Sequence, residues 1–138
     1  MRLAIVASRF NEEISGQLLQ RARAAAAAAG ISDCYVMQVP GALEIPLALQ
    51  WLAQSGRFDA LVALGCVIRG ETHHFDIVAN ESARGLMDVA LEFGIPIANG
   101  ILTTEDEAQA TARLDKGTEA VQVALEMARM KAGLHEDR

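Results

Sequence analysis

The chain has 138 residues, of which 51% are apolar and 22% are charged, and this length and composition are typical of one globular domain. A net charge of -6, without a dense cluster of Lys and Arg, argues against binding to nucleic acid or to an anionic membrane. The longest apolar run, residues 60–68, is less than half of the about twenty residues that a membrane-spanning helix needs. We therefore expect one soluble domain over residues 1–138.

Strand-like and helix-like segments alternate along the chain. Continuous apolar runs predict strands covered on both faces, and the longer stretches between them predict helices. Such alternation normally gives a parallel sheet with right-handed crossovers. The prediction is an α/β fold, a three-layer sandwich whose four-stranded parallel sheet has helices on both faces. The expected strands are 3–7, 34–39, 60–68 and 95–101, and the expected helices are 12–29, 43–54, 74–93, one from about 105 and one over 118–130, followed by a frayed tail at 133–138.

Local signals support several of these boundaries. Asn11 can cap the first helix, and Pro46 fits the first turn of the second. Thr104 with Glu107 has the pattern of a capping box at the start of the short helix. Helix 43–54 carries apolar residues on more than one side, so we expect one of its faces to contact a second chain.

The two cysteines, Cys34 and Cys66, lie in apolar stretches and are too few for a disulfide scaffold. They predict free thiols in a reducing, cytoplasmic compartment. The residues after Met1 begin a strand pattern at once, without the charged, apolar and cleavage regions of a secretory signal. We accordingly expect that no leader is removed.

Polar and aromatic residues follow the predicted strands, where an open parallel sheet has its ligand crevice. Phe10 suits stacking on a planar ring, the alternative being a core or staple position. Glu44 would either accept hydrogen bonds from a ligand or complement its helix dipole. Arg113 and Lys116 would neutralise a phosphate or simply be solvated. The segments expected to converge at the crevice are 8–11, 40–44, 69–74 and 99–100.

The segment after the third strand carries the richest chemistry. Gly70, Glu71 and Thr72 lead into a helix whose free N–H groups and dipole favour an anion, although a turn with a Thr cap explains the same residues. The pair His73 and His74 matches no known metal-ligand spacing, so we expect no metal site. A histidine beside an anion suits proton transfer near neutral pH, with a solvated histidine as the alternative.

Taken together in chain order, these motifs resemble those of the lumazine synthases. The resemblance extends from Arg2 to about Met130, and it implies the flavodoxin-like form of the predicted sandwich. It rests on SRFN at 8–11, VPGALEIP at 39–46, GCVIRGETHHF at 65–75, NGILTT at 99–104, and KG at 116–117 before a helix that ends in ALEMA at 124–128.

The resemblance implies a transferase of riboflavin biosynthesis. Such enzymes condense 5-amino-6-(D-ribitylamino)uracil with 3,4-dihydroxy-2-butanone 4-phosphate to give 6,7-dimethyl-8-ribityllumazine, phosphate and water, without a cofactor or a metal. By analogy His74 would be the proton donor. The pyrimidine would be bound by Phe10, Ala42, Leu43, Glu44, Cys66, Val67, Ile68 and Asn99, and the phosphate by Gly70, Glu71, Thr72, Arg113 and Lys116.

The sequence departs from the family pattern at three places. Asn99 stands where many members carry a second aromatic residue against the ring, which predicts weaker pyrimidine binding. The junction 113–117 is shorter than in many relatives, so the resemblance does not fix the exact placement of Arg113 and Lys116. The chain also begins at its first strand, whereas many relatives have a leading segment that pairs with a neighbouring subunit, and we expect this difference to affect assembly.

Members of the family assemble as pentamers with active sites between adjacent subunits, and some assemble further into sixty-subunit shells. We expect a pentamer and a functional link to riboflavin synthase, and the sequence does not decide whether a shell forms.

One alternative function is that of the related archaeal type of riboflavin synthase, which the anion segment and His74 disfavour. Another is a non-catalytic flavin- or lumazine-binding or shell-forming scaffold, which Asn99 permits. A flavodoxin-type carrier or a receiver domain would need different residues at 8–11.

Overall fold

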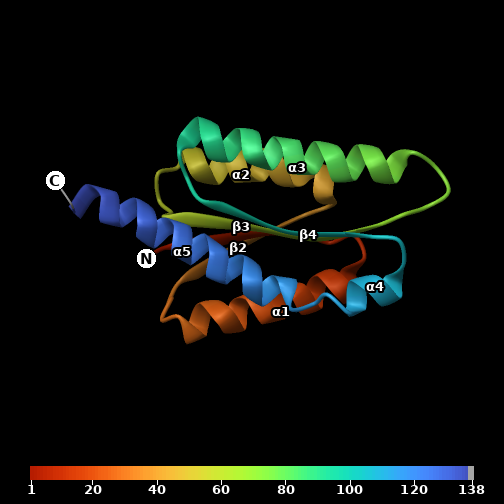
Figure 1. The fold of residues 1–138 in the computed structure, drawn as a ribbon, viewed down its shortest axis with the longest axis horizontal. Helices are drawn as coiled ribbons and strands as arrows, with labels where there is room; N and C mark the ends of the chain where they lie inside the picture. The colour runs from red at the N-terminus through yellow and green to blue at the C-terminus, as the bar shows by residue number, and fades with distance from the viewer. Residues whose placement is uncertain (137–138) are drawn as a thin grey trace.

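The computed structural model describes residues 1–136 and contains one four-stranded parallel sheet in the order β2-β1-β3-β4 (Figure 1). The strands are β1 (Leu3–Ser8), β2 (Cys34–Val39), β3 (Ala60–Ile68) and β4 (Ile97–Thr104). The helices are α1 (Glu12–Ala28), the 3₁₀ helix η1 (Ala42–Glu44), α2 (Ile45–Gln54), α3 (His74–Phe93), α4 (Glu107–Thr111) and α5 (Lys116–Glu136).

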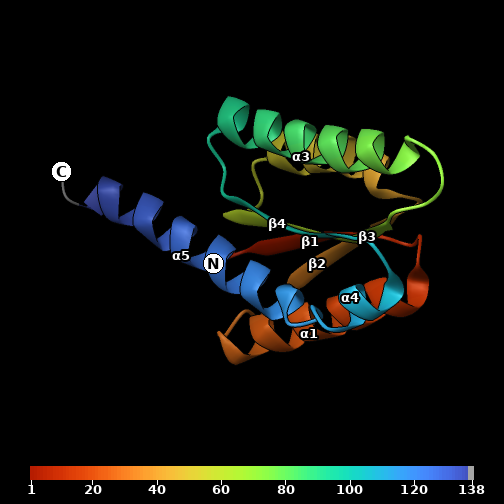
Figure 2. The ribbon, with the colours of Figure 1, turned by 45° about the vertical axis from the view of Figure 1, so that its right-hand side comes forward.

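Helices cover both faces of the sheet, as the alternation of elements predicts. α2 and α3 lie on one face, and α1, α4 and α5 lie on the other (Figures 1 and 2). From β1 the chain first adds β2 on one side and then crosses to β3 and β4 on the other, so the strand order reverses between β1 and β3. The predicted three-layer α/β sandwich of flavodoxin-like type is confirmed.

The core lies on both sides of β1 and β3. Along β1, Ala4 and Val6 pack in the cluster with α2, whereas Leu3 and Ile5 pack in the cluster with α1 and α5. β2 lies at an edge of the sheet, and most of its side chains remain partly exposed. The prediction that all four strands are covered on both faces is therefore wrong for β2, because an apolar run does not show which strand lies at an edge.

β4 begins and ends later than the predicted strand 95–101. The N–H of Ile95 donates to the carbonyl oxygen of Ala90 at 3.2 Å and so belongs to the C-terminal turn of α3. At the other end, Thr103 and Thr104 extend β4 by pairing with the last residues of β3. Hydropathy misses these threonines because their hydroxyls are polar, although their β-branched side chains favour strands.

Two of the predicted caps are wrong. Asn11 has a left-handed backbone (φ 56°) and makes no capping bond; its Nδ2 instead donates to the carbonyl oxygen of Cys66 at 2.9 Å. α4 is capped by Asp106, whose Oδ1 accepts from the N–H of Gln109 at 2.8 Å. The hydroxyl of Thr104 donates to the carbonyl oxygen of Asp106 instead. Short polar side chains bond to whichever backbone group the fold brings nearest, so their sequence position alone does not settle the partner.

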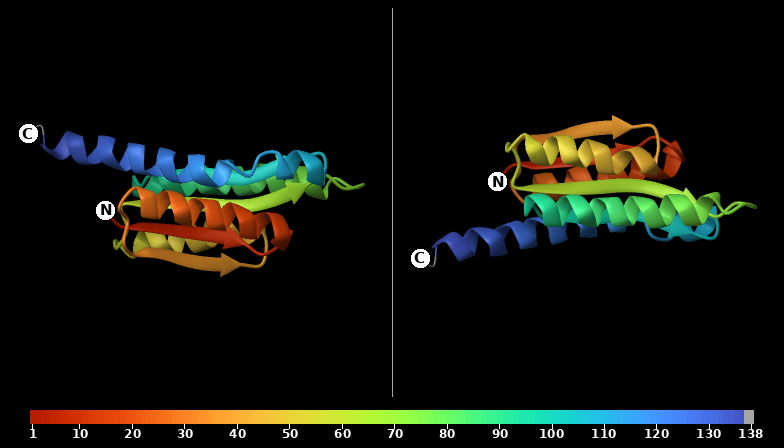
Figure 3. Two further views of the ribbon diagram at one scale, coloured as in Figure 1. Left: turned by 90° about the horizontal axis from the view of Figure 1, so that it is seen from below. Right: turned by 90° about the horizontal axis from the view of Figure 1, so that it is seen from above.

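The last helix is longer than predicted. α5 continues through Glu136, so the tail expected to fray from Gly133 is helical as far as the structure describes it, and Asp137 and Arg138 lie outside the described residues. The first part of α5 packs against α1 and the sheet, and its last turns extend beyond them (Figure 3). At the start of α5, a Cβ on Gly117 would overlap the carbonyl oxygen of Leu18, so α1 and α5 are in backbone contact there.

Candidate active site

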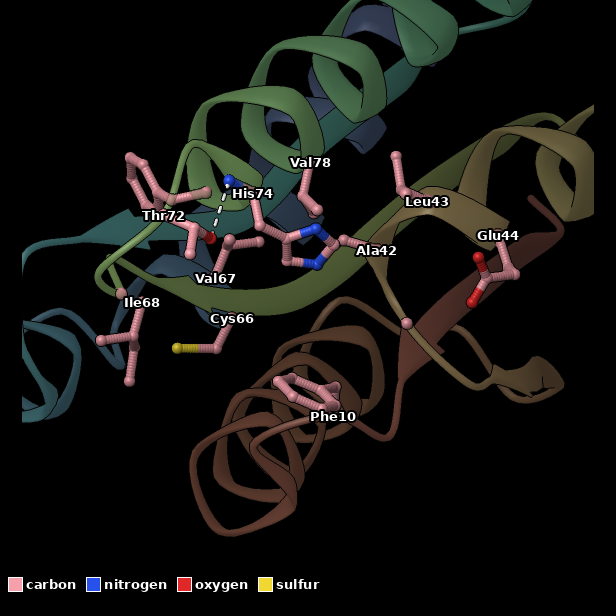
Figure 4. Close-up of a pocket in the computed structure, with 13 residues that line it drawn as sticks. Phe10, Ala42, Leu43, Glu44, Cys66, Val67, Ile68, Thr72, His74 and Val78 are labelled. Carbon is pink, nitrogen blue, oxygen red and sulfur yellow. Dashed lines mark hydrogen bonds between the residues drawn. The ribbon is translucent and has the colours of Figure 1, made fainter.

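A cavity of about 370 Å³ lies at the carboxyl ends of β1, β2 and β3, beside the point at which the strand order reverses. Open α/β sheets form ligand crevices at such points because the connections on either side run in opposite directions. Its walls come from the β1–α1 turn, η1, the end of β3 and the start of α3 (Figure 4). The lining residues are Phe10, Gly41, Ala42, Leu43, Glu44, Cys66, Val67, Ile68, Gly70, Thr72, His74, Phe75 and Val78.

Phe10 forms one wall of this cavity and is 70% exposed, so it is not a core residue. The N–H groups of Arg9 and Phe10 donate to the carbonyl oxygens of Val39 (2.8 Å) and Pro40 (3.1 Å), which continues the β1–β2 pairing past the strands. On the other side of the turn, the bond from Asn11 to β3 holds the backbone in place. The turn therefore presents an aromatic ring at the mouth of the cavity, where it is free to stack on a planar ligand.

The facing wall is Gly41 and η1, which lead into α2. The predicted helix 43–54 is divided here, because a 3₁₀ turn precedes α2, while Pro46 occupies the first turn of α2 as predicted. The N–H of Glu44 donates to the carbonyl oxygen of Gly41 at 3.2 Å and closes that turn. Ala42 is buried, and the carboxylate of Glu44 is exposed at the rim as a hydrogen-bond acceptor (Figure 4).

The end of β3 supplies the base of the cavity. Cys66 and Val67 are buried, and Ile68 is half-buried. Burial raises the pKa of the Cys66 thiol to about 11, and the Glu107 carboxylate adds a smaller increase in the same direction. Both cysteines are free, as predicted. At neutral pH Cys66 is thus a protonated, apolar part of the wall and not a nucleophile.

The last wall joins the end of β3 to the N-terminus of α3. Thr72 Oγ1 accepts a hydrogen bond from the N–H of His74 at 3.3 Å, which leaves the hydroxyl proton free to donate. The first N–H groups of a helix have no partners within it, so this end of α3 offers donors to an anion. The imidazole of His74 extends into the cavity between Ala42 and Val78 (Figure 4). Anion donors and a group that can transfer a proton therefore share one wall.

Three of the predicted phosphate ligands do not line this cavity. Glu71 is exposed on the anion segment but is not part of the lining. Arg113 and Lys116 line a separate depression of about 490 Å³ beside β4 and the start of α5. There Arg113 Nη1 donates to the carbonyl oxygen of Gln109 at 2.9 Å, and Lys116 Nζ lies 3.9 Å from Glu119 Oε2. Within one chain the anion segment and these two cations form separate sites.

Asn99 also lies outside the cavity. The prediction placed it at the carboxyl end of the fourth strand, but β4 continues to Thr104, and Asn99 lies part-way along this edge strand, opposite Ala63 of β3. Five residues of strand, roughly 16 Å, separate it from the end of β4. Its Oδ1 accepts a hydrogen bond from the N–H of Ile101 at 2.9 Å, and the side chain is exposed at the edge of the sheet. The predicted convergence of the fourth segment on the cavity is wrong within one chain.

Phe75 and Val78 line the cavity and lie outside the segments expected at the crevice. Gly41 and Asn11 lie within those segments without a predicted role: Gly41 lines the cavity, and Asn11 fixes the turn that carries its aromatic wall. Val78 is four residues after His74 on α3, so helical periodicity points to it once His74 is chosen. The role of Asn11 depends on a contact between distant parts of the chain and has no local signal.

Among the side chains that the structure describes, those of residues 1–134, no group of three or more His, Cys, Asp and Glu could hold a metal ion. No helix in the same range is long and apolar enough to cross a membrane. The chemistry of the cavity walls is that of hydrogen-bond donors, one imidazole, one carboxylate and apolar surface.

Comparison with known proteins identifies the family. Residues 1–132 match the family model described as 6,7-dimethyl-8-ribityllumazine synthase. The chain belongs to this family. It is 58% identical over 137 residues to the 6,7-dimethyl-8-ribityllumazine synthase of Nitrosomonas europaea, covering 97% of this chain and 84% of that protein. It is 51% identical over 139 residues to the protein of the same name from Paraburkholderia phymatum, covering 99% and 81%.

A third protein named 6,7-dimethyl-8-ribityllumazine synthase, from Albidiferax ferrireducens, is 53% identical over 133 residues, which cover 94% of this chain and 85% of that protein. The resemblance to the lumazine synthases that the sequence motifs indicated is confirmed. Three of the motifs that carried it, at 8–11, 39–46 and 65–75, contribute residues to the cavity, whereas those at 99–104, 116–117 and 124–128 lie outside it.

Proposed function

We propose that this chain is a 6,7-dimethyl-8-ribityllumazine synthase that condenses 5-amino-6-(D-ribitylamino)uracil with 3,4-dihydroxy-2-butanone 4-phosphate and releases phosphate and water. The observation that carries the proposal is one cavity that combines a stacking ring, anion donors and an imidazole, in a chain of the lumazine synthase family. This reaction joins a planar heterocycle to a phosphorylated sugar fragment, so it needs each of these three features.

The proposed roles follow the walls of the cavity. Phe10 stacks on the pyrimidine, and residues 42–44 and 66–68 hold the ring and the ribityl chain, with Glu44 as an acceptor for hydroxyl or ring N–H groups. Gly70 and Thr72 donate to the phosphate from the start of α3. Glu71 contributes its backbone N–H, since its carboxylate would repel the anion.

His74 is the proposed proton-transfer group. The amine of one substrate attacks the ketone of the other, water leaves as an imine forms, phosphate is eliminated, and the second ring closes with loss of a second water; each of these steps moves a proton. A single imidazole beside the phosphate can serve several of them near neutral pH. Holding two substrates in one orientation supplies much of the remaining rate enhancement, because it replaces a random encounter.

We further propose that a neighbouring subunit of a homopentamer completes each site with Asn99, Arg113 and Lys116. Two observations support a shared site: within one chain these residues lie outside the cavity, and α2 leaves Leu47 (53%) and Trp51 (56%) exposed one turn apart. The sequence predicts that one apolar face of the helix over 43–54 contacts a second chain. Leu47 and Trp51 lie on that face. A cytoplasmic location and a functional link to riboflavin synthase complete the proposal.

The two alternatives fit the site less well. An archaeal-type riboflavin synthase uses no phosphorylated substrate, and so it has no use for anion donors beside His74. A scaffold that only binds flavin or lumazine would need the stacking wall but not the imidazole inside the cavity. The relatives that match nearly the whole chain are named as synthases.

The test is to mix the purified protein with both substrates and to follow the fluorescent lumazine. We expect formation well above the uncatalysed background, with His74→Ala slowing turnover roughly ten- to a thousandfold and Arg113→Ala mainly raising the KM of the phosphorylated substrate. Formation at the background rate in an intact oligomer would favour the scaffold. Unchanged kinetics in either variant would remove that residue from its proposed role.

A further inference from the structure

Arg69, the first residue after β3, is bound to two elements that are distant in the sequence. Its Nε lies 2.8 Å from Oε2 of Glu105 in the β4–α4 turn, and its Nη2 lies 3.5 Å from Oδ1 of Asp76 in the first turn of α3. Its guanidinium covers the ring of Phe75, with 4.4 Å between Cζ and the ring centroid. Its N–H donates to the carbonyl oxygen of Thr104 at 2.9 Å. One residue thus joins the start of α3 to the end of β4.

The anion segment begins directly after this residue. Residues 70–73 are exposed, and among the side chains described, those of residues 1–134, the hydrogen bonds that hold them are local: Thr72 Oγ1 with the N–H of His74, and the carbonyl oxygen of His73 with the N–H of Ile77. The position of the segment relative to the cavity therefore depends on its two ends. Arg69 fixes one end, and through Asp76 and Phe75 it also fixes the other.

The guanidinium of Arg69 is not itself arranged as an anion ligand. Two carboxylates already compensate its charge, and an aromatic ring covers one of its faces. Exposed ion pairs of this kind contribute little to stability, so holding the protein folded does not account for the arrangement. A planar fork that bonds in two directions and stacks on a ring is, however, well suited to fixing geometry.

The same arginine is also connected to Arg113 of its own chain, which by the proposed function serves the cavity of an adjacent subunit. The N–H of Glu105 donates to Oε1 of Gln109 at 2.8 Å, and the carbonyl oxygen of Gln109 accepts from Nη1 of Arg113 at 2.9 Å. The ion pair between Arg69 and Glu105 therefore links the anion segment of the chain to the turn that orients its Arg113.

We propose that Arg69 is a positioning residue for phosphate binding: it holds the segment 70–73 and the first turn of α3 against the β4–α4 turn. This inference rests on the proposed function, because the phosphorylated substrate is what the segment would bind. It predicts that losing the Arg69 contacts weakens binding of the phosphorylated substrate selectively. The pyrimidine, which contacts Phe10 and the η1 wall, should be bound almost as before.

The test compares Arg69→Met and Arg69→Lys with the wild type in two-substrate kinetics. We expect Arg69→Met to raise the KM of the phosphorylated substrate about tenfold and to change the KM of the pyrimidine by less than about twofold. Arg69→Lys should restore only part of the difference, since an ammonium group lacks the planar fork. The matched control is Arg84→Met, which removes an arginine that also bonds to two carboxylates of α3, Glu81 and Asp88, outside the cavity lining.

Each outcome separates this inference from the proposed function. A wild type without turnover overturns the proposed function and the inference that rests on it. An active wild type with an unchanged KM in Arg69→Met, or with equal increases for both substrates, overturns the inference alone, as does the same selective effect in Arg84→Met. Light scattering on all variants identifies any loss of assembly, which would raise both KM values together.

Discussion

At the scale of single residues, the fold raises the pKa of one group in the cavity wall, the thiol of Cys66. Cys66 ionises only near pH 11, because burial disfavours the thiolate, whereas an ordinary thiol has the value 9.0. At pH 8 the thiolate is therefore about a hundredfold scarcer than in an unfolded chain. Below about pH 9 the thiol is protonated in the folded and in the unfolded chain, and its contribution to the free energy of unfolding is intact. That contribution is lost as the pH rises toward about 11, because the unfolded chain releases the proton first.

Alkylation measures this difference. In a Cys34→Ser background, we expect iodoacetamide at pH 8 to modify Cys66 in the native protein roughly a hundredfold more slowly than in urea. Mass spectrometry gives both rates. Equal rates in the two conditions would show that the thiol is neither buried nor shifted, and would argue against its place in the wall.

Asn99 gives a second prediction at this scale. Its amide oxygen is already bonded to the backbone of its own strand, so Asn99 offers only its NH₂ group to a ligand bound by the adjacent subunit. An aromatic ring at this position would add a stacking contact worth about 0.5–1.5 kcal/mol. We expect Asn99→Phe to tighten binding of the pyrimidine substrate about two- to tenfold in calorimetry, and Asn99→Ala not to do so. Equal affinities for Asn99→Phe and Asn99→Ala would place the residue outside the site.

The residues of the cavity differ in how far the sequence predicts them. Phe10, Thr72 and His74 follow directly after buried strands, and the position of a strand's carboxyl end in a parallel sheet is determined by the topology alone. Asn11 bonds to Cys66, which is distant along the chain, and the place of Asn99 depends on how far β4 pairs with β3. Residues of the first kind are predictable, whereas those of the second need the fold.

At the scale of elements, the close contact between α1 and α5 depends on one glycine. A side chain at Gly117 meets the backbone of α1 at Leu18, so Gly117→Ala must separate the two helices. We expect a loss of about 1–3 kcal/mol in the free energy of unfolding, measured by urea denaturation at fixed protein concentration. Gly16→Ala is the control, because nothing lies near its added methyl group and alanine should stabilise α1 by about 0.5–1 kcal/mol. A gain in stability for both variants would show that α1 and α5 are not in close contact.

The strands also differ in how far the local sequence predicts their boundaries and their exposure. β3 is apolar along its length, and its predicted boundaries are those of the structure. β4 extends to Thr104 because β3 beside it offers free backbone groups. The β-branched side chains of Thr103 and Thr104 favour a strand, but they do not show that β3 extends far enough to pair with them. The exposure of β2 has the same origin, since the strand order places it at an edge.

At the scale of the whole molecule, large apolar side chains are exposed on three helices, α2, α3 and α5. α2 buries Ile45, Ala48 and Leu49 against its own sheet and leaves Leu47 and Trp51 in solvent. Exposed large apolar residues one turn apart on one helix mark an interaction surface more often than a free surface. The proposed site is also incomplete within one chain, since Arg113 lies outside the cavity. Both features have one explanation if the missing groups come from a copy of the chain that packs on α2.

The final prediction tests that explanation. Trp51 does not line the cavity, so Trp51→Glu should affect turnover only through assembly. We expect light scattering to give a homopentamer, or a multiple of it up to sixty chains, for the wild type, and smaller species without turnover for Trp51→Glu, because a buried unpaired carboxylate opposes association. Gln17→Glu, an exposed position on α1, controls for the added charge and should remain assembled and active. An active monomer, in either the wild type or Trp51→Glu, would show that one chain contains the complete site and that Arg113 and Asn99 have no part in it.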